Sequence, residues 1–422
     1  MGFCAAKFIW HPLFRNLPAP CSVRHDPPRE LPLAEIVKNS VRKIKLCLHC
    51  ADTGCVHHIT LPGRRQVGAF PADRGHAARF VRRATSPRFD LEPSSAVADG
   101  ASNPILPAPA QDPHVTLHRG LYYYCESAAT GIYLRVAQDF LALGQAPRVL
   151  VWAPPKKGPA SQNVWAPELH ILNGRAYIYF AADDGNNARH RMWVLTAETE
   201  NLLGRYRLAA SLDTGGWAID GTVFSDDRGA LYCVWSGWPG RVDGQQNLYI
   251  SRMADPLTLI GPRVLIAKPD QSWERKGMPI CEGPQVLRRE GRTFIVYSAS
   301  ASWTADYCLG MLVSEGRDLL NPQSWKKAGQ VFGRNEHAWG VGHCGFLETP
   351  QGEHWIFYHA KTLRRPGWGD REVRAQPFAW STVGWPILGE PAARSLPLRR
   401  RLATVSPLRS TSVSPGAERK SA

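Results

Sequence analysis

The amino-acid sequence predicts an all-β fold, a five-bladed β-propeller with four-stranded antiparallel blades. The first observation is a β-hairpin pattern that occurs five times, with two short strands on either side of a turn glycine. The second is the interval between these glycines, which is 54, 55, 62 and 61 residues and suits a recurring four-stranded sheet. The third is that helical periodicity is absent from the same region.

Each hairpin is expected from its own residues. The five hairpins cover residues 112–127, 165–182, 220–237, 282–300 and 343–360, with turn glycines Gly120, Gly174, Gly229, Gly291 and Gly352. A glycine adopts the positive φ that a tight turn requires. After the turn, bulky residues occupy alternate positions, as Tyr177 and Tyr179 do, so one face of the strand can enter a core.

Two further strand-like segments follow each hairpin and complete a blade. They cover residues 247–253 and 262–267 in the third copy, and 307–313 and 328–333 in the fourth. The propeller should therefore extend from about Asn103 to Pro391. A two-sheet sandwich also has short strands and glycine turns, but five copies in the same phase favour the propeller.

Charge divides the chain into three predicted parts. Residues 1–100 carry a net charge of +7, the end from residue 394 carries +6, and the segment between them carries only +2 of the total of +15. We expect a largely unstructured basic, Pro-rich extension over 1–100, a propeller domain over 101–392 and a disordered basic tail over 393–422. A nearly neutral body disfavours a nucleic-acid partner, and no apolar segment is long enough for a membrane span. The sequence does not indicate an oligomeric state.

The ten cysteines do not form a disulfide pattern. Five lie singly in the body, and the others lie between residues 4 and 55. The spacing of Cys47, Cys50, Cys55, His57 and His58 could hold zinc, but no second pair follows at a suitable distance, so unordered sequence is favoured. Unpaired cysteines and a start with little resemblance to a secretory signal slightly favour the cytoplasm, with export as the alternative.

One residue at the head of each hairpin is a candidate site residue. Counting back from the turn glycine gives Asp112, Trp165, Asp220, Glu282 and His343. The innermost strands of a propeller all follow its central channel, so these five positions should converge at one mouth.

Carboxyl groups in such a ring suggest glycosidic bond cleavage with inversion. In this reaction one carboxylate activates water while a carboxylic acid protonates the leaving oxygen, with room for the water between them. A third carboxylate nearby keeps the acid protonated by like-charge repulsion. The alternative is that the ring is a structural set of hydrogen bonds without catalytic function.

Five ordered motifs resemble glycoside hydrolase family 43. They are "NPILPAPAQDPHV", "VWAPELH", "WAIDGTVF", "CEGPQVL" and "GVGHCGF". The resemblance implies a five-bladed propeller that removes arabinofuranosyl or xylosyl units with inversion and needs no cofactor for its chemistry. It implies that Asp112 is the general base, Glu282 the general acid, and Asp220 the residue that orients the acid and raises its pKa.

The same resemblance suggests further site residues. His343 corresponds to a family histidine beside a calcium ion in the channel, although "GHCGF" differs from the more frequent "GHNSF". Trp165 would line the sugar pocket, and Arg374 would hydrogen-bond the terminal sugar unless it is a strand-surface arginine. Trp217, Trp303 and Tyr307 are additional candidates for substrate binding.

The closing segment "REVRAQPFAWSTVGWPILGEP" is most similar to the α-L-arabinofuranosidase branch. The expected activity is therefore exo-acting removal of terminal α-L-arabinofuranosyl residues from arabinan or arabinoxylan oligosaccharides. A β-D-xylosidase of the same family is one alternative. A catalytically silent propeller that binds glycans is another, because this fold supports many functions.

Overall fold

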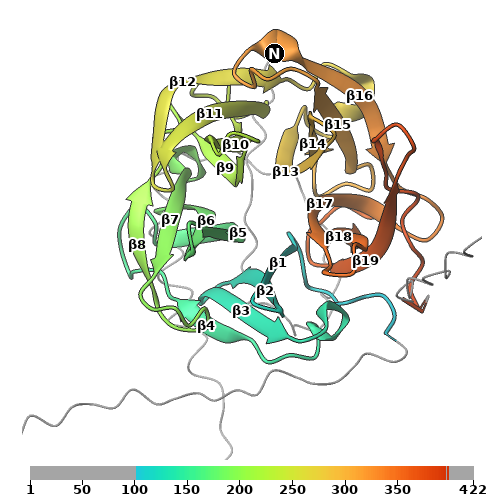
Figure 1. Cartoon of the computed structure of the whole chain (residues 1–422), viewed down its shortest axis with the longest axis horizontal. Helices are drawn as coiled ribbons and strands as arrows, with labels where there is room; N and C mark the ends of the chain where they lie inside the picture. Colours follow the sequence, from blue (N-terminus) through green and yellow to red (C-terminus); the bar gives the residue numbers. More distant parts are fainter. Residues whose placement is uncertain (1–100, 396, 399–422) are drawn as a thin grey trace, which may run out of the picture. The chain divides into compact units, whose positions relative to one another are not determined.

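Five antiparallel sheets, each with four strands, surround a common axis in the computed structural model of the protein (Figure 1). The structure describes residues 101–395, 397 and 398. In every sheet the strands are hydrogen-bonded in sequence order, so each blade is built from one continuous segment. This confirms the predicted five-bladed propeller.

The strands of the blades are as follows. Blade 1 contains β1 (His114–His118), β2 (Leu121–Ala128), β3 (Gly131–Ala137) and β4 (Val149–Trp152). Blade 2 contains β5 (Gln162–Leu172), β6 (Arg175–Asp183), β7 (Arg191–Ala197) and β8 (Tyr206–Ser211). Blade 3 contains β9 (Ala218–Ser225), β10 (Leu231–Gly237), β11 (Asn247–Asp255) and β12 (Thr258–Ala267). Blade 4 contains β13 (Cys281–Arg289), β14 (Arg292–Ala299), β15 (Cys308–Ser314) and β16 (Trp325–Phe332). Blade 5 contains β17 (Trp339–Glu348), β18 (His354–Lys361), β19 (Arg371–Trp380) and β20 (Pro386–Ile387).

Short 3-10 helices lie in four of the connections. They are η1 (Phe140–Ala142), η2 (Asn187–Arg189), η3 (Ser272–Glu274) and η4 (Pro322–Ser324).

The five turn glycines have the backbone conformation that the sequence predicts. Their φ angles lie between +75° and +80°. In blades 1, 2 and 4 the preceding residue also has positive φ, at Arg119, Asn173 and Glu290. Two consecutive left-handed residues form a two-residue hairpin turn that matches the twist of the flanking strands.

Each pair of neighbouring blades encloses one hydrophobic cluster. Between blades 1 and 2, for example, Ile132 and Leu134 pack with Ile178, Phe180 and Leu195, and all five are fully buried. Four other clusters fill the remaining interfaces, including the interface between blades 5 and 1. Burial of this apolar surface between sheets, rather than within one sheet, stabilises the ring.

The segment before β1 fastens the first blade to the last. Leu106 and Val373 of β19 exchange two backbone hydrogen bonds, of 3.2 and 2.9 Å. The buried Asn103 side chain donates to the Ala375 carbonyl oxygen and accepts from the Ala375 amide, at 2.9 and 2.8 Å. Removal of this buried side-chain amide would leave both polar groups of Ala375 without their partner, which is costly. The segment therefore joins blade 1 to blade 5 by hydrogen bonds, while each blade keeps four strands that are consecutive in the sequence.

Several other predictions concern regions at the two ends. The extension over 1–100, its cysteine and histidine cluster and nearly all of the tail lie outside the described residues, so the domain boundaries stay predictions. Within the described part, Cys125, Cys233, Cys281, Cys308 and Cys344 are all free and buried. No helix there is long and apolar enough to span a membrane.

Candidate active site

The inner strands β1, β5, β9, β13 and β17 surround the central axis (Figure 1), and each has its candidate residue within it or, for Asp112, two residues before it. A position with positive φ lies eight or nine residues before each turn glycine, within the inner strand or, in blade 1, two residues before it. These positions are Asp112 (51°), Ala166 (42°), Asp220 (55°), Gly283 (53°) and His343 (44°). A left-handed residue in a strand changes the direction of the side chains around it, as in a β-bulge.

This pattern corrects the equivalence expected from counting. Asp112, Asp220 and His343 are structurally equivalent, but Trp165 and Glu282 each precede the left-handed residue of their strand. Counting back from the turn glycine fails because the turns differ in length. Blades 3 and 5 have longer turns, which move the glycine one residue farther from the strand.

Asp112 lies among three basic side chains. Its Oδ1 is 3.4 Å from Nδ1 of His343, 3.3 Å from Nδ1 of His359 and 3.6 Å from Nη1 of Arg371. Burial alone would raise the pKa of Asp112, but these neighbours hold it well below its usual range. Asp112 is therefore a carboxylate across the ordinary pH range, which is the form that a general base requires.

Asp220 and Glu282 form a coupled pair of buried carboxyl groups. The amide of Gly283 donates to Oδ2 of Asp220 at 3.1 Å, and the hydroxyl of Tyr307 donates to Oε1 of Glu282 at 2.9 Å. Burial raises the pKa of Asp220 well above its ordinary value, and the charges of Glu282 and Asp112 raise it further. The pair therefore retains a proton under conditions in which an exposed carboxyl has lost it.

A second layer of side chains lies two residues farther along the inner strands. Its centre is Glu168, which accepts from Nε2 of His170 at 2.8 Å and from the amide of Gln285 by a short hydrogen bond. Nε2 of His114 lies 3.8 Å from the same carboxylate. Burial would raise the pKa of Glu168, but His114, His170 and Thr222 together lower it. A negative charge is thus held close enough to the site to contribute to the raised pKa of Asp220.

His114, Glu168 and His170 form a group of possible metal ligands among the described residues. Their ligand atoms lie within 4.8 Å of one another. However, Nδ1 of His114 accepts a hydrogen bond from the Leu169 amide at 3.2 Å, so Nε2 carries the proton in the neutral ring. Burial lowers the pKa of His114 to about 4, which keeps the ring neutral. A protonated Nε2 is a donor to Glu168 rather than a metal ligand.

His343 does not have the environment of a calcium ligand. Its Nδ1 faces Asp112 at 3.4 Å and Asp220 at 3.9 Å, and Arg371 brings a positive charge to the same carboxylate. Calcium requires six to eight oxygen ligands, and an imidazole does not supply one. No catalytic step here is therefore assigned to a calcium ion.

Trp165 and Trp217 differ in their access to substrate. Trp165 stacks on His190 with ring centroids 4.1 Å apart, and it is 37% exposed, so one face is available. Its role in binding a sugar stays a prediction. Trp217 is 4% exposed, stacks on Trp238 and donates its indole N–H to the Asn187 carbonyl oxygen. Little of the Trp217 surface is open to a substrate, and its predicted substrate contact stays a prediction.

The predicted sugar contact of Arg374 is also wrong. The side chain is fully buried, and its guanidinium bonds Glu372 at 2.8 Å and the carbonyl oxygens of His337 and Ala392. Arg371, three residues earlier on β19, was not among the predicted site residues, but its side chain reaches Asp112. Residues an odd number of positions apart in a strand point to opposite faces of the sheet. Arg371 and Arg374 are three positions apart, so only one of them can reach Asp112.

Tyr307 and Trp303 come from the segment between β14 and β15. Tyr307 is fully buried, stacks on His359 and bonds Glu282, so it positions the candidate acid and does not contact substrate as predicted. Trp303 is half-buried beside Trp368 with ring centroids 5.5 Å apart. The role of Trp303 in substrate binding stays a prediction.

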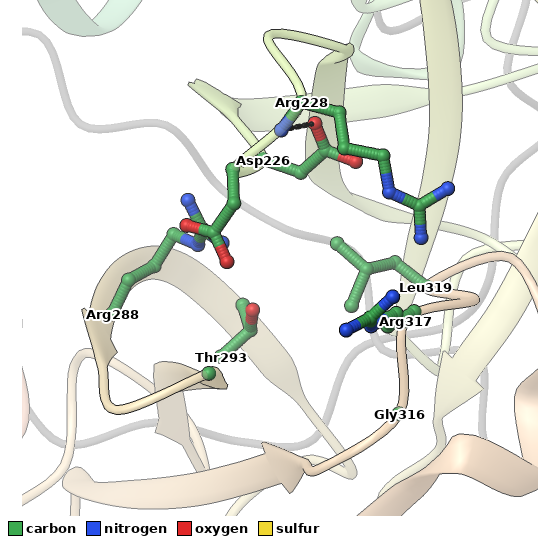
Figure 2. Close-up of a pocket in the computed structure, with 9 residues that line it drawn as sticks. Asp226, Arg228, Arg288, Thr293, Gly316, Arg317 and Leu319 are labelled. Atoms are coloured by element: carbon green, nitrogen blue, oxygen red, sulfur yellow. Dashed lines mark hydrogen bonds and ion pairs between the residues drawn. The ribbon is translucent and has the colours of Figure 1, made fainter.

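A cavity of about 300 Å³ lies between blades 3 and 4, away from these carboxyl groups (Figure 2). The hairpin-turn ends of the blades line it, so it opens at the opposite end of the axis from Asp220. Three of its charged groups have partners within the protein, since Arg288 pairs with Asp227 at 2.8 Å and Asp226 accepts from the Arg228 amide at 2.9 Å. We assign no site to this cavity.

A five-bladed propeller that holds one ionised carboxylate and one protonated pair of carboxyl groups at the same end of its axis has the architecture of a glycoside hydrolase. The model of the family Glycosyl hydrolases family 43 matches residues 101–386. The chain belongs to this family.

Relatives with known names support this assignment. Alpha-L-arabinofuranosidase 43 from Humicola insolens is 35% identical over 311 residues, covering 69% of this chain and 64% of that protein. An extracellular exo-alpha-(1->5)-L-arabinofuranosidase from Streptomyces avermitilis is 34% identical with the same coverage of both proteins. The chain therefore spans 64%, slightly less than two thirds, of the length of these relatives.

Solved structures agree with the fold. The alpha-L-arabinofuranosidase from Lactobacillus brevis has a TM-score of 0.65 and 33% sequence identity, covering 69% of this chain and 97% of that one. The xylan beta-1,4-xylosidase from Bacillus halodurans has a TM-score of 0.56 at 19% identity, covering 69% and 57%, and supports the fold alone.

Proposed function

We propose that the protein is an inverting, exo-acting α-L-arabinofuranosidase that acts on arabinan or arabinoxylan oligosaccharides. The observation that carries the proposal is the contrast between two environments in one site. Asp112 is held as a carboxylate by three basic side chains, and the Asp220–Glu282 pair retains a proton. Two carboxyl environments of this kind supply the base and the acid of glycoside hydrolysis. The names of the relatives support the choice of sugar.

The reaction is a single displacement. Asp112 removes a proton from water as the water oxygen bonds to the anomeric carbon. Glu282 gives its proton to the departing glycosidic oxygen, and the hydroxyl of Tyr307 fixes the orientation of this carboxyl group. Asp220 lies against the backbone amide of Gly283, beside the acid, and its charge disfavours ionisation of the pair. The chemistry of these residues requires no cofactor.

The location of the protein in the cytoplasm stays a prediction.

The proposal is tested with α-1,5-linked arabino-oligosaccharides and 4-nitrophenyl β-D-xyloside as parallel substrates. We expect release of single arabinose units from the non-reducing end, with the anomeric configuration inverted in the proton NMR spectrum of the first product. Preferred turnover of the xyloside would assign the β-D-xylosidase alternative. Saccharide binding by calorimetry without turnover of either substrate would assign a silent glycan-binding propeller.

The charge of Asp220 should determine the alkaline limit of activity. The raised pKa of Asp220 means that the carboxyl pair loses its proton at higher pH than an isolated group would. In Asp220→Asn the remaining carboxyl has no charged partner, so the alkaline limb of kcat/KM should move to lower pH, by about one unit or more. The pH profile of the variant on an arabino-oligosaccharide measures this. An unchanged or higher limb would contradict the electrostatic role.

A further inference from the structure

The segment between β18 and β19, residues 362–370, presents an exposed tryptophan beside the candidate active site. Trp368 is 48% exposed, which is unusual for an indole in this structure, where other tryptophans of the described region are mostly covered. Its ring packs edge-on against Trp303, with an interplanar angle of 71°. Its N–H donates to Oγ of Ser302 at 3.1 Å. The orientation of the exposed face is therefore fixed.

The backbone around Trp368 is also held in place. Lys361 is fully buried, and its ammonium group donates to the Gly367 carbonyl oxygen and to Asp370 Oδ1, both at 2.5 Å. The Gly367 amide donates to the Trp303 carbonyl oxygen at 2.8 Å. The buried Lys361 thus fixes the backbone on both sides of Trp368. A ligand that contacts the Trp368 ring would therefore cost the segment little conformational entropy.

Short contacts connect Trp368 with both sides of the carboxyl site. Its carbonyl oxygen accepts from Nε of Arg371 at 3.1 Å, and Nη1 of the same arginine lies 3.6 Å from Asp112. On the other side, the segment that carries Trp303 continues to Tyr307, which bonds Glu282. The tryptophan pair therefore lies where blade 5, which carries Trp368, meets blade 4, which carries Trp303 and the candidate acid Glu282.

We propose that the exposed face of Trp368 stacks on the sugar unit at the leaving-group side of the cleaved bond. This inference rests on the proposed function. The general acid must lie next to the departing oxygen, so the leaving sugar extends toward the side of the site that carries Glu282. Flat apolar surface with a fixed orientation suits the C–H face of a sugar ring, and Trp368 provides it without moving.

The test compares two substrates that share the arabinofuranosyl group and differ in the leaving group. One is α-1,5-linked arabinotriose, and the other is α-L-arabinofuranosyl fluoride, which has no leaving sugar. Trp368→Ala should lower kcat/KM for the triose about tenfold, mainly through KM, and leave the fluoride unchanged. Trp368→Phe should restore most of the loss. Leu363→Ala, at a residue of the same segment that is 43% exposed, serves as the control and should match the unsubstituted protein on both substrates.

The outcomes separate this inference from the proposed function. Equal loss on both substrates would show that Trp368 only maintains the structure, and no loss on the triose would show that it does not contact the leaving sugar. Either result overturns the stacking role while leaving the arabinofuranosidase activity in place. Absence of turnover of both substrates by the unsubstituted protein would overturn the proposed function and this inference together.

Discussion

Glu282→Gln is expected to lower kcat for α-1,5-linked arabinobiose by about 10³-fold, within the range of general acid catalysis. The glutamine preserves the size of the side chain and an oxygen that can accept from Tyr307. It has no acidic proton, so a sugar alkoxide must leave unaided. A 2,4-dinitrophenyl α-L-arabinofuranoside has a leaving group that is stable without protonation, and its turnover should fall by less than about tenfold. The ratio of the two losses is the measurement that identifies the acid.

A matched variant separates this effect from general damage to blade 4. Glu315→Gln makes the same chemical change at an exposed carboxylate that pairs with Arg292 at 3.2 Å on this blade. Exposed ion pairs contribute little to stability, so both substrates should be hydrolysed at the unsubstituted rate. If Glu282→Gln slowed the two substrates equally, the acid would have to be another group, and Asp220 would be the first to examine because it carries the raised pKa.

The fold could be predicted because its main signal is local. A glycine in a short turn and alternating bulky residues define a hairpin without reference to the rest of the chain, and five repeats define the ring. The meeting of Asp112, Asp220 and Glu282 then follows from the topology, since every inner strand starts at the same end of the axis.

The remainder of the site depends on properties that have no local signal. Arg371 and Arg374 lie in one short segment, and only the register of β19 decides that the first reaches Asp112 and the second is buried beside Glu372. Trp217 could not be separated from Trp165 because burial depends on packing between blades. The role of Glu168 was missed for the same reason, because the left-handed position two residues before it in β5 is seen only in the structure.

Asp112→Asn should lower kcat for both arabinobiose and the dinitrophenyl glycoside, each by about 10³-fold, because water must be activated whichever group leaves. Asparagine is well suited to this position, since Asp112 has a φ of +51° and asparagine tolerates the left-handed region. The variant should therefore fold, which its thermal unfolding midpoint will show. Asp227→Asn, at a carboxylate that is 75% exposed on the opposite side of the propeller, is the control and should retain full activity.

The comparison of arabinobiose with the dinitrophenyl glycoside distinguishes loss of the base from loss of the acid. Loss of the acid affects only the substrate with the poor leaving group, whereas loss of the base affects both. The depressed pKa of Asp112 adds a second test, because a base that is ionised across the ordinary range contributes no acid limb above about pH 4 to the profile of the unsubstituted enzyme. An Asp112→Asn variant that kept its rate on the dinitrophenyl glycoside would show that another group activates the water. The three basic side chains around Asp112 would then have only a structural role.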